Sequence, residues 1–297
     1  MRRRDFMACG SAFILSPAHA DAHADADADA AVPAALSGYE RATGGHVGVY
    51  AHNIVTGRKL LWRADERFVM CSTFKASLVA CVLSHVDQGR DGLDRVIPLT
   101  GADIQDWYAP VAKAALAQGH AGMSVEDMCK GAVEQSDNSC ATLLLSRIGG
   151  PPALTAFWRA MGDGTTRLDD PEPFLNRTPA GGVRDTTTPA AMAGIMQGLV
   201  LGAVLSPSSR ALLTRWLIGC QTGKNRLRAG LPANWVVGDK TGNNARDAAG
   251  DIAVAWPHPD MPIVMCVYTR GGTPTEPQFA NVFAGVGRLV ARTLTTG

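Results

Sequence analysis

The stretch Cys71-Ser72-Thr73-Phe74-Lys75 organises the chain, because two chemically active side chains open a buried helix there. The apolar run that follows is interrupted only by Ser77 and predicts a helix over about 72–86, buried nearly all round. Ser72 and Lys75 would lie one turn apart on the same helix face. A lysine kept neutral by burial can take the proton of a serine hydroxyl. A capped helix with a stray lysine is the alternative, since this spacing arises by chance in roughly one such chain in four.

Composition limits the classes of function. With 297 residues, 46% of them hydrophobic, the chain can bury a large core in one domain or two lobes. A net charge of +1 gives no reason to expect a nucleic-acid partner, and no apolar run reaches the ~18 residues of a membrane span. Seven cysteines form no Cys-x-x-Cys, and the seven histidines form no ligand cluster in the folded region. No metal or cofactor is therefore expected.

Residues 1–20 have the features of an export signal. Three arginines precede a modest apolar stretch, and Ala18-His19-Ala20 fits a small-x-small cleavage site. Arg3-Arg4-Asp5-Phe6 resembles the core of a twin-arginine signal, which serves proteins exported already folded. Residues 21–32 alternate alanine and aspartate and predict a disordered tail. The mature protein is therefore expected in the periplasm or outside the cell.

Strand-like runs occur at both ends of the chain and helical patterns fill the middle, which predicts an α/β fold of the α+β type with two lobes. Residues 33–70 and 220–297 would form an α/β lobe, with an antiparallel sheet flanked by helices. Residues 71–219 would form an all-α lobe that includes a long loop, 162–189. The active site is expected in the cleft between the lobes. The expected strands are 46–53, 59–63, 235–240, 251–256 and 263–269, and the last helix covers 278–293.

Two further short motifs carry candidate chemistry. In Ser136-Asp137-Asn138, the first and third side chains would point the same way from an extended loop. The alternative is an ordinary turn or helix N-cap. Lys240-Thr241-Gly242 ends a strand, and its glycine would let another backbone or a ligand approach closely. The alternative there is a strand that simply runs into a turn.

The segment Glu172-Pro173-Phe174-Leu175-Asn176 lies in the long loop, which is unusually long for a compact domain and so is a functional candidate. Glu172 could activate a water molecule that Asn176 holds from the other side. A solvated loop acid is the alternative. We expect a cis peptide between Glu172 and Pro173, because Asp-Pro-Glu-Pro must turn sharply and cis bonds are tolerated mainly before proline.

These four stretches, in this order, resemble the class A β-lactamases over about residues 33–293. Ser-x-x-Lys with Lys-Thr-Gly would suit any penicillin-recognising enzyme, and Glu172-x-x-Leu175-Asn176 narrows the resemblance to this class. The resemblance implies a monomer that hydrolyses penicillins and cephalosporins, small β-lactams being its partners, and so gives antibiotic resistance.

The resemblance implies catalytic roles. Ser72 would attack the lactam carbonyl and be acylated, and Ser136 would relay a proton to the leaving nitrogen. Lys75 and Glu172, the latter through a water, are alternative bases for that step. Glu172 and Asn176 would position the water that frees the acyl-enzyme.

The resemblance also implies substrate contacts. The backbone N–H groups of Ser72 and Asn243 would form the oxyanion hole. Arg226 would bind the substrate carboxylate, unless it is a solvated surface residue, and Tyr108 would form the aromatic wall of the cleft, unless it packs in the core. The implied substrate-binding residues are Tyr108, Asn138, Arg226, Lys240, Thr241, Gly242 and Asn243, of which Lys240 is also counted as catalytic.

Cysteine positions depart from the family pattern. Members that hydrolyse carbapenems often tie the cysteine matching Cys71 to one at the position of Asn244, so this difference disfavours efficient carbapenem hydrolysis. A second family disulfide would join Cys129 to the position of Val79, and Cys81 is two residues off.

The neck of the long loop, 162–189, also differs from the family pattern. Asp170 stands where many members carry an arginine that pairs with the aspartate matching Asp185. Two carboxylates at pairing distance repel each other, so either they separate or a cation lies between them. Arg167, Arg177 and Arg184 are the candidate cations. Without a bridging arginine, the loop should be looser than is usual in the family.

Two other functions remain as alternatives. A peptidoglycan DD-peptidase would be acylated by β-lactams but release them slowly, and a sensor protein would capture the drug without turnover. Glu172 and Asn176 disfavour both, because neither protein needs a deacylating base. Steady-state turnover of a chromogenic cephalosporin distinguishes the three.

Overall fold

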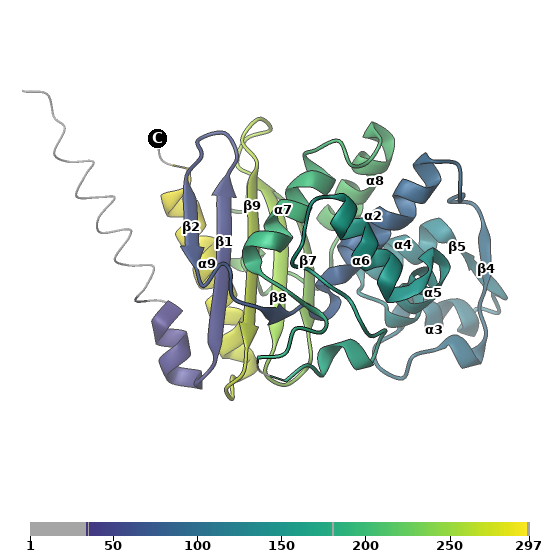
Figure 1. Cartoon of the computed structure of the whole chain (residues 1–297), viewed down its shortest axis with the longest axis horizontal. Coiled ribbons are helices and arrows are strands. Elements are labelled where there is room, and N and C mark those ends of the chain that lie inside the picture. Colours follow the sequence, from purple (N-terminus) through teal and green to yellow (C-terminus); the bar gives the residue numbers. More distant parts are fainter. Residues whose placement is uncertain (1–33, 35, 180, 296–297) are drawn as a thin grey trace, which may run out of the picture.

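The computed structural model describes residue 34, residues 36–179 and residues 181–295. The expected export signal, 1–20, and the Ala/Asp tail, 21–32, lie outside these described residues. A five-stranded antiparallel sheet stands beside a helical region, as Figure 1 shows, and the two-lobed α+β prediction is confirmed. A helix over residues 36–43 precedes the first strand.

Both ends of the chain contribute to the sheet, whose strand order is β2-β1-β9-β8-β7. All five predicted strands are present, with one difference. β7 continues to Asn243, so the Lys-Thr-Gly motif lies inside the strand rather than at its end. The reason is pairing, because Gly242 and Asn243 lie opposite Gly250 and Ala249 of β8. The strands are β1 (His46–Asn53), β2 (Lys59–Trp62), β7 (Val236–Asn243), β8 (Ala249–Trp256) and β9 (Ile263–Arg270).

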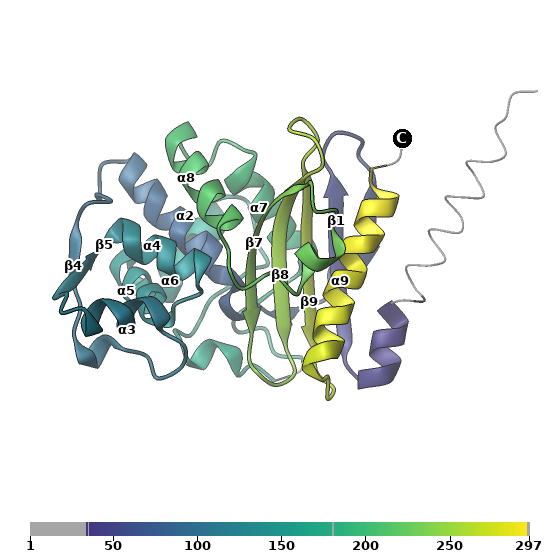
Figure 2. The same ribbon diagram turned by 180° about the vertical axis from the view of Figure 1, so that it is seen from behind.

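Both faces of the sheet are covered by helices, since successive side chains of a strand point to opposite faces. Ile252 and Val254 of β8 join the core under α7 (Pro189–Val200), which lies in front of the sheet in Figure 1. Ala253 and other residues of the opposite face pack with α9 (Glu276–Thr293), which Figure 2 shows from the other side. Burial on both faces explains why β8 and β9 are continuous apolar runs.

The helical region surrounds α2 (Phe74–Asp87), in which every residue from Phe74 to Ser84 is buried. The predicted helix over 72–86 is present, but its first turn, η1 (Cys71–Thr73), is a 3-10 helix. Ser72 therefore lies on a tight turn just before the α-helix. The other helices are α3 (Pro110–Ala117), α4 (Val125–Glu134), α5 (Asn138–Ile148), α6 (Gly150–Ala160) and α8 (Pro207–Ile218), with the short η2 (Gly101–Asp103), η3 (Phe174–Asn176) and η4 (Leu227–Gly230).

The prediction that residues 71–219 are all α-helical is wrong in two places. β4 (Val96–Pro98) pairs with β5 (Gly122–Ser124) at the far end of the helical region. β6 (Thr186–Thr187) pairs with β3 (Phe68–Val69), so the end of the long loop is fastened just before Ser72. Strands of two or three residues are too short to give an alternating pattern.

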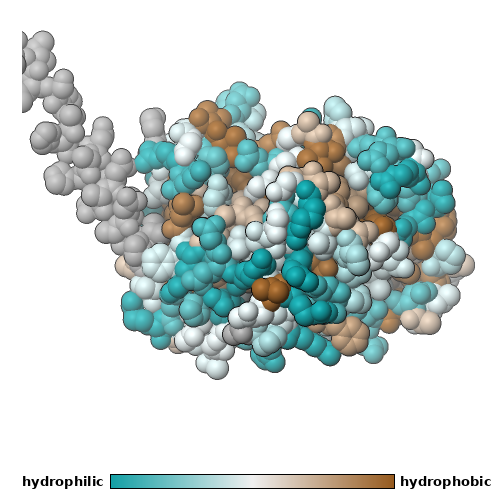
Figure 3. Space-filling model, viewed as in Figure 1, coloured by the Kyte–Doolittle hydropathy of each residue, from teal (hydrophilic) through white to brown (hydrophobic). Residues whose placement is uncertain are grey.

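The outer surface is mainly hydrophilic on the face drawn in Figure 3, where the hydrophobic spots are scattered. Within the described ranges, no helix is long and apolar enough to cross a membrane. Cys71, Cys81, Cys129 and the other cysteines of the described part are buried and unpaired, so neither family disulfide forms there.

Candidate active site

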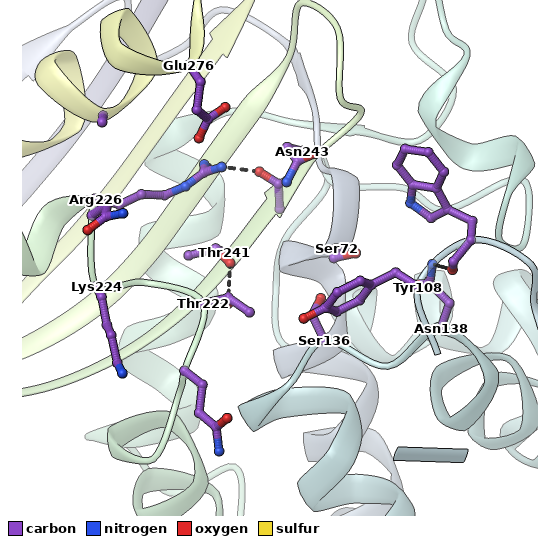
Figure 4. Close-up of a pocket in the computed structure, with 15 residues that line it drawn as sticks. Ser72, Tyr108, Ser136, Asn138, Thr222, Lys224, Arg226, Thr241, Asn243 and Glu276 are labelled. Carbon is purple, nitrogen blue, oxygen red and sulfur yellow. Dashed lines mark hydrogen bonds between the residues drawn. The ribbon is translucent and has the colours of Figure 1, made fainter. Parts of the chain in front are cut away.

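A cleft of about 460 Å³ separates the sheet from the helical region. In Figure 4, Ser72 lies between one wall that carries Arg226, Thr241 and Asn243 and another that carries Tyr108, Ser136 and Asn138. Gly242 also lines the cleft. Residues more than 160 positions apart in the chain therefore converge on one serine hydroxyl. Lys75, Glu172 and Lys240 are almost completely buried beside it.

Ser72 is held on a turn with an unusual backbone. Cys71, just before it, has φ +47°, a conformation that L-residues rarely adopt and that occurs often at functional sites. Thr73 anchors the turn, since its hydroxyl donates to Met70 O at 2.7 Å and lies 2.9 Å from the Tyr268 hydroxyl. A Cβ on Gly242 would come within 2.6 Å of Ser72 N, so only glycine lets β7 approach this closely.

Lys75 and Glu172 meet beside the serine. Ser72 Oγ lies 3.4 Å and Lys75 Nζ lies 3.8 Å from the same oxygen, Glu172 Oε1. Lys75 also donates to Ser136 O at 2.8 Å and to Asn138 Oδ1. Burial lowers the pKa of Lys75, while the charge of Glu172 opposes that shift. Glu172 Oε1 is therefore within reach of the Ser72 hydroxyl, and Lys75 Nζ approaches the same oxygen.

Ser136 lies between two lysines. Its carbonyl oxygen accepts from Lys75, and its hydroxyl accepts from Lys240 Nζ at 2.9 Å. The expected extended loop is wrong at this motif, because Asp137 is the N-cap of α5 and Asn138 is its first residue. Ser136 and Asn138 nevertheless both reach the cleft, since Ser136 has φ +59° and turns its side chain inward. Asn138 Nδ2 also donates to Trp107 O at 2.5 Å, which ties this helix start to the aromatic rim of the same wall.

The carboxylate-binding end of the cleft is built on β7. Lys240 is fully buried, and burial lowers its pKa to about 7. Its Nζ donates to Ser136 Oγ and to Thr241 O, the latter at 2.7 Å. The hydroxyls of Thr241 and Thr222 lie 2.5 Å apart, so Thr222 fixes the rotamer of the residue that faces the cleft. Two hydroxyls and a lysine therefore converge where a substrate carboxylate is expected.

Arg226 supports the same end of the cleft from behind. Its Nη1 donates to Gly242 O at 3.2 Å and to Gly250 O at 3.1 Å, and the guanidinium stacks over Phe283 at 4.9 Å. It is 9% exposed and lines the cleft, so the solvated surface alternative is wrong. A buried guanidinium that holds two adjacent strands keeps its charge next to the cleft.

Two aromatic side chains form the outer rim. Tyr108 is 54% exposed and Trp107 is 51% exposed, and both line the cleft. The core-packing alternative for these aromatics is therefore wrong. Tyr108 has φ +53°, and its carbonyl oxygen accepts from the Asn138 backbone N–H at 3.1 Å, which fixes the rim to α5.

The comparisons with known proteins decide the family. A model described as "Beta-lactamase enzyme family" matches residues 31–294. Beta-lactamase L2 of Stenotrophomonas maltophilia is 46% identical over 256 residues, which covers 85% of this chain and 82% of the relative. The structure of the last common ancestor of Gram-negative bacteria class A β-lactamase matches with a TM-score of 0.84 at 48% identity, covering 89% of this chain and 99% of that chain. This chain belongs to the class A serine β-lactamases.

Two other similar proteins agree with this membership. Beta-lactamase CTX-M-25 of Escherichia coli is 39% identical over 255 residues, which covers 86% of each chain. The structure of a β-lactamase from Xanthomonas campestris matches with a TM-score of 0.85 at 40% identity, covering 90% of this chain and 98% of that chain. Hydrolysis of β-lactams is the activity of the family.

The catalytic loop of this class A chain carries Glu172 inward. The peptide bond between Glu172 and Pro173 is cis, which confirms the prediction. The Glu172 side chain is 2% exposed, so the solvated loop acid alternative is wrong. Asn176 ends the short helix η3, and its side chain lies outside the described part of the structure.

The neck of that loop is held by separate partners. Arg184 Nη2 donates to Asp170 Oδ1 at 2.7 Å, whereas Asp185 Oδ1 accepts the backbone N–H groups of Asp169 and Asp170 at 2.8 and 2.9 Å. Among the described residues, no arginine bridges the two carboxylates, and Asp185 Oδ2 is buried without a hydrogen-bond partner. Burial raises the pKa of Asp185 to about 6. Arg167, the third arginine near the neck, pairs with Asp169 instead.

Several residues of the cleft were missed by the sequence reasoning. Thr222 lies four positions before Arg226, so the assignment of the arginine already pointed to its segment. Lys224 and Glu276 also line the cleft, and no local pattern marks either of them. Nowhere in the described ranges do three or more histidine, cysteine or acidic side chains group closely enough to hold a metal ion.

Proposed function

We propose that this class A β-lactamase hydrolyses the lactam amide of penicillins and cephalosporins through an acyl-enzyme on Ser72, and so gives resistance to them. The observation that carries the proposal is the meeting of three groups at one oxygen. Ser72 Oγ and Lys75 Nζ lie 3.4 and 3.8 Å from Glu172 Oε1. A hydroxyl with basic groups in reach, inside a buried pocket, is the arrangement that activates a serine nucleophile.

Acylation follows from this geometry. Ser72 Oγ attacks the lactam carbonyl carbon, and its proton passes either to neutral Lys75 or, through a water, to Glu172. The backbone N–H groups of Ser72 and Asn243 would stabilise the negative charge that develops on the carbonyl oxygen. The carbon–nitrogen bond then breaks, and Ser136 relays to the ring nitrogen the proton that Ser72 gave up. The product is an ester between Ser72 and the opened ring.

Deacylation needs a second base. Glu172 removes a proton from a water that attacks the ester carbonyl, and the Ser72 oxygen leaves with a proton as the free hydroxyl. Asn176 is expected to hold the other side of this water. Because Glu172 is on a loop separate from the serine, it can serve this step without displacing Lys75.

Substrate carboxylate binding is assigned to the opposite end of the cleft. Thr241 offers a hydroxyl, and Lys240 and Arg226 supply positive charge behind it. An anion between buried cations and hydroxyl donors is strongly favoured. This end therefore orients the lactam carbonyl toward Ser72.

The cellular setting is proposed from the sequence. A cleaved export signal at residues 1–20, of the twin-arginine type, supports a periplasmic or secreted protein. We also propose that the mature protein acts as a monomer.

The two catalytic steps are separated by two variants. Ser72→Ala should lower the turnover of a chromogenic cephalosporin by at least about 10⁴-fold, because the nucleophile is lost. Glu172→Ala should instead accumulate a penicilloyl adduct, seen by intact-protein mass spectrometry, because the deacylating water loses its base. The exposed Glu126→Ala is the matched control and should turn over normally without an adduct.

The same experiment decides between the proposal and its alternatives. A wild-type protein that retains the adduct and turns over slowly would be a DD-peptidase or a sensor. A Glu172→Ala protein without an adduct, or with undiminished turnover, would remove Glu172 from the deacylating role.

A further inference from the structure

A second pocket, of about 310 Å³, lies between the catalytic loop and one end of the sheet. Four arginines line it, and each comes from a different segment. Arg67 precedes β3, Arg177 belongs to the catalytic loop, Arg246 lies in the turn between β7 and β8, and Arg270 ends β9. His46, which pairs with Arg270 in the sheet, lines it as well. The pocket therefore joins the loop that carries Glu172 to the sheet.

The lining has a large excess of positive charge. Asp247 is the one carboxylate among the lining residues, and it pairs with Arg246 at 3.4 Å. Glu66, which is not part of the lining, pairs with Arg270 Nη2 at 2.6 Å. These two carboxylates offset only two of the four guanidinium groups. The net charge that faces the pocket is therefore positive.

The other two arginines have no carboxylate partner among the described residues. Arg67 donates to two neutral oxygens, Thr165 O at 3.1 Å and Thr186 Oγ1 at 2.9 Å. Arg177 stacks on the Phe174 ring at 4.8 Å. A guanidinium carries five donors, so both groups retain donors for a ligand.

Two nitrogen atoms of the lining residues are buried. Arg270 Nε has no hydrogen-bond partner in the described part of the chain, and His46 Nδ1 lies 3.9 Å from Glu66 Oε2, beyond hydrogen-bond distance. An unpaired buried donor is costly, and such atoms in a native structure call for an explanation. Because the Arg270 side chain is 28% exposed and lines the pocket, an oxyanion there would interact with its guanidinium group.

We propose that this pocket binds a phosphate-type oxyanion and thereby fastens the catalytic loop to the sheet. A tetrahedral dianion offers acceptors in several directions at once, which suits a pocket lined by arginines from four segments. Arg177 is five residues from Glu172 in the chain, so an anion held by Arg177 and Arg67 crosslinks the loop to the segment before β3. This crosslink supplies a connection that the neck, without an Asp170–Asp185 bridge, does not provide.

The binding test uses the mature enzyme and inorganic phosphate, with chloride at equal ionic strength as the reference. We expect saturable stabilisation in a melting experiment and a calorimetric dissociation constant below about 1 mM, as several charge-assisted hydrogen bonds would give. Arg177→Ala/Arg246→Ala should weaken phosphate binding by at least about tenfold. Arg184→Ala, another exposed arginine of the same loop, which pairs with Asp170 outside the pocket, is the matched control and should bind phosphate normally.

The catalytic cleft could also attract phosphate, so Arg226→Ala serves as a second control. If phosphate affinity falls in Arg226→Ala but not in Arg177→Ala/Arg246→Ala, the anion binds in the cleft and the proposal is overturned. Stabilisation no greater than that of chloride would overturn it too.

A crystal soaked in tungstate should show the heavy oxyanion within hydrogen-bond distance of Arg67 and Arg177. Parallel titrations with inorganic phosphate and glycerol phosphate distinguish a free anion from a phosphate monoester, and tighter binding of either supports the site. These readouts need no hydrolysis, so their failure would leave the proposed β-lactamase reaction untouched.

Discussion

The floor of the cleft consists of Ser72, Lys75 and Lys240. The floor and the catalytic loop hold their catalytic groups in opposite ways. On the floor, Ser72, Lys75 and Lys240 stand on a buried helix and a strand of the sheet, and each is fixed by short hydrogen bonds or close backbone contacts. In the loop, Glu172 depends on a neck whose Arg184–Asp170 pair is largely exposed, with side-chain exposures of 57% and 33%. Exposed ion pairs stabilise little. The acylating groups are therefore placed by buried contacts, whereas the deacylating group lies on a loop whose neck combines the β3–β6 pairing and the Asp185 hydrogen bonds with an exposed ion pair.

The first test disturbs the floor of the cleft. Gly242→Ala would place a Cβ 2.6 Å from Ser72 N, so β7 must move away from the nucleophile. We expect kcat/KM for benzylpenicillin to fall by roughly 100-fold, because a misplacement near 1 Å has that effect on catalysis. Gly238→Ala, on the same strand, would contact Leu217 Cβ at 3.1 Å and is the matched control. It should lose stability but keep activity, and equal activity losses in the two variants would contradict the tight-floor interpretation.

The second test concerns the charge on the floor. The free enzyme should lose kcat/KM as pH rises above about 7, because burial lowers the pKa of Lys240 to about 7 and neutral lysine cannot attract a carboxylate. Well above that pH the fall should be about tenfold per pH unit. Lys240→Arg keeps its charge, so its pH profile should lack this limb. An unchanged limb in the variant would assign the ionisation to another group.

Lys240 has a matching effect on stability. Its folded pKa, about 7, lies below the unfolded value near 10.4, so the unfolded chain binds more protons between these pH values. The free energy of unfolding contributed by this group therefore rises with pH from about 7 to about 10. In urea melts, this rise should be smaller for Lys240→Met.

The third test strengthens the loop instead of weakening the floor. Asp170→Arg would give Asp185 Oδ2 the cation that it lacks. A gain of about 1 kcal/mol corresponds to a Tm increase of roughly 2–4 °C in a chain of this size. A tighter loop should admit bulky oxyimino cephalosporins less well, so the ratio of ceftazidime to benzylpenicillin kcat/KM should fall by roughly three- to tenfold.

A matched variant isolates the added cation in this test. Asp170→Asn removes the exposed pair with Arg184 without supplying a cation, and it should leave the Tm unchanged. Two results would contradict the loose-loop explanation. One is no gain in Tm for Asp170→Arg, and the other is an unchanged or higher ratio of ceftazidime to benzylpenicillin kcat/KM.

The fourth test is a pH-dependent one at Asp185. Its folded pKa is raised to about 6 by burial, above the unfolded value near 3.9. The folded state then binds more protons between these values, so this group's contribution to stability is present below about pH 4 and lost as pH rises through about 6. Asp185→Asn should therefore raise the Tm at pH 7.5 and leave it nearly unchanged at pH 4. Equal gains at both pH values would exclude ionisation of Asp185 as the cause.

The parts of the fold that follow local periodicity could be predicted from the sequence. The apolar run after Ser72 and the alternating or continuous runs of β1 and β9 each bury side chains in a regular pattern, which is visible without a structure. The short pairs β3–β6 and β4–β5 could not be predicted, because their partners are set by tertiary packing.

The site was predictable as a set of motifs but not as a set of contacts. Ser72 and Lys240 could be named from short patterns, whereas the Thr222–Thr241 contact depends on how α8 and β7 pack. The arginine at the loop neck shows the same limit, since Arg167 and Arg184 are equally charged, and Arg167, the nearer to Asp170 in sequence, does not pair with it. The folded backbone alone determines that Arg184 pairs with Asp170 and that Arg167 pairs with Asp169.

The strand order has a consequence for how the protein is made. β1 is hydrogen-bonded to β9 along its whole length, from His46 opposite Arg270 to Asn53 opposite Ile263. β1 can pair early with β2 on one edge, but its other edge stays unpaired until β9 has left the ribosome. Contacts so distant in sequence form slowly, and a chain that waits with unpaired strand edges is prone to aggregation. Productive folding must follow release of the complete chain, and chaperones that bind exposed β1 should raise the yield of active enzyme.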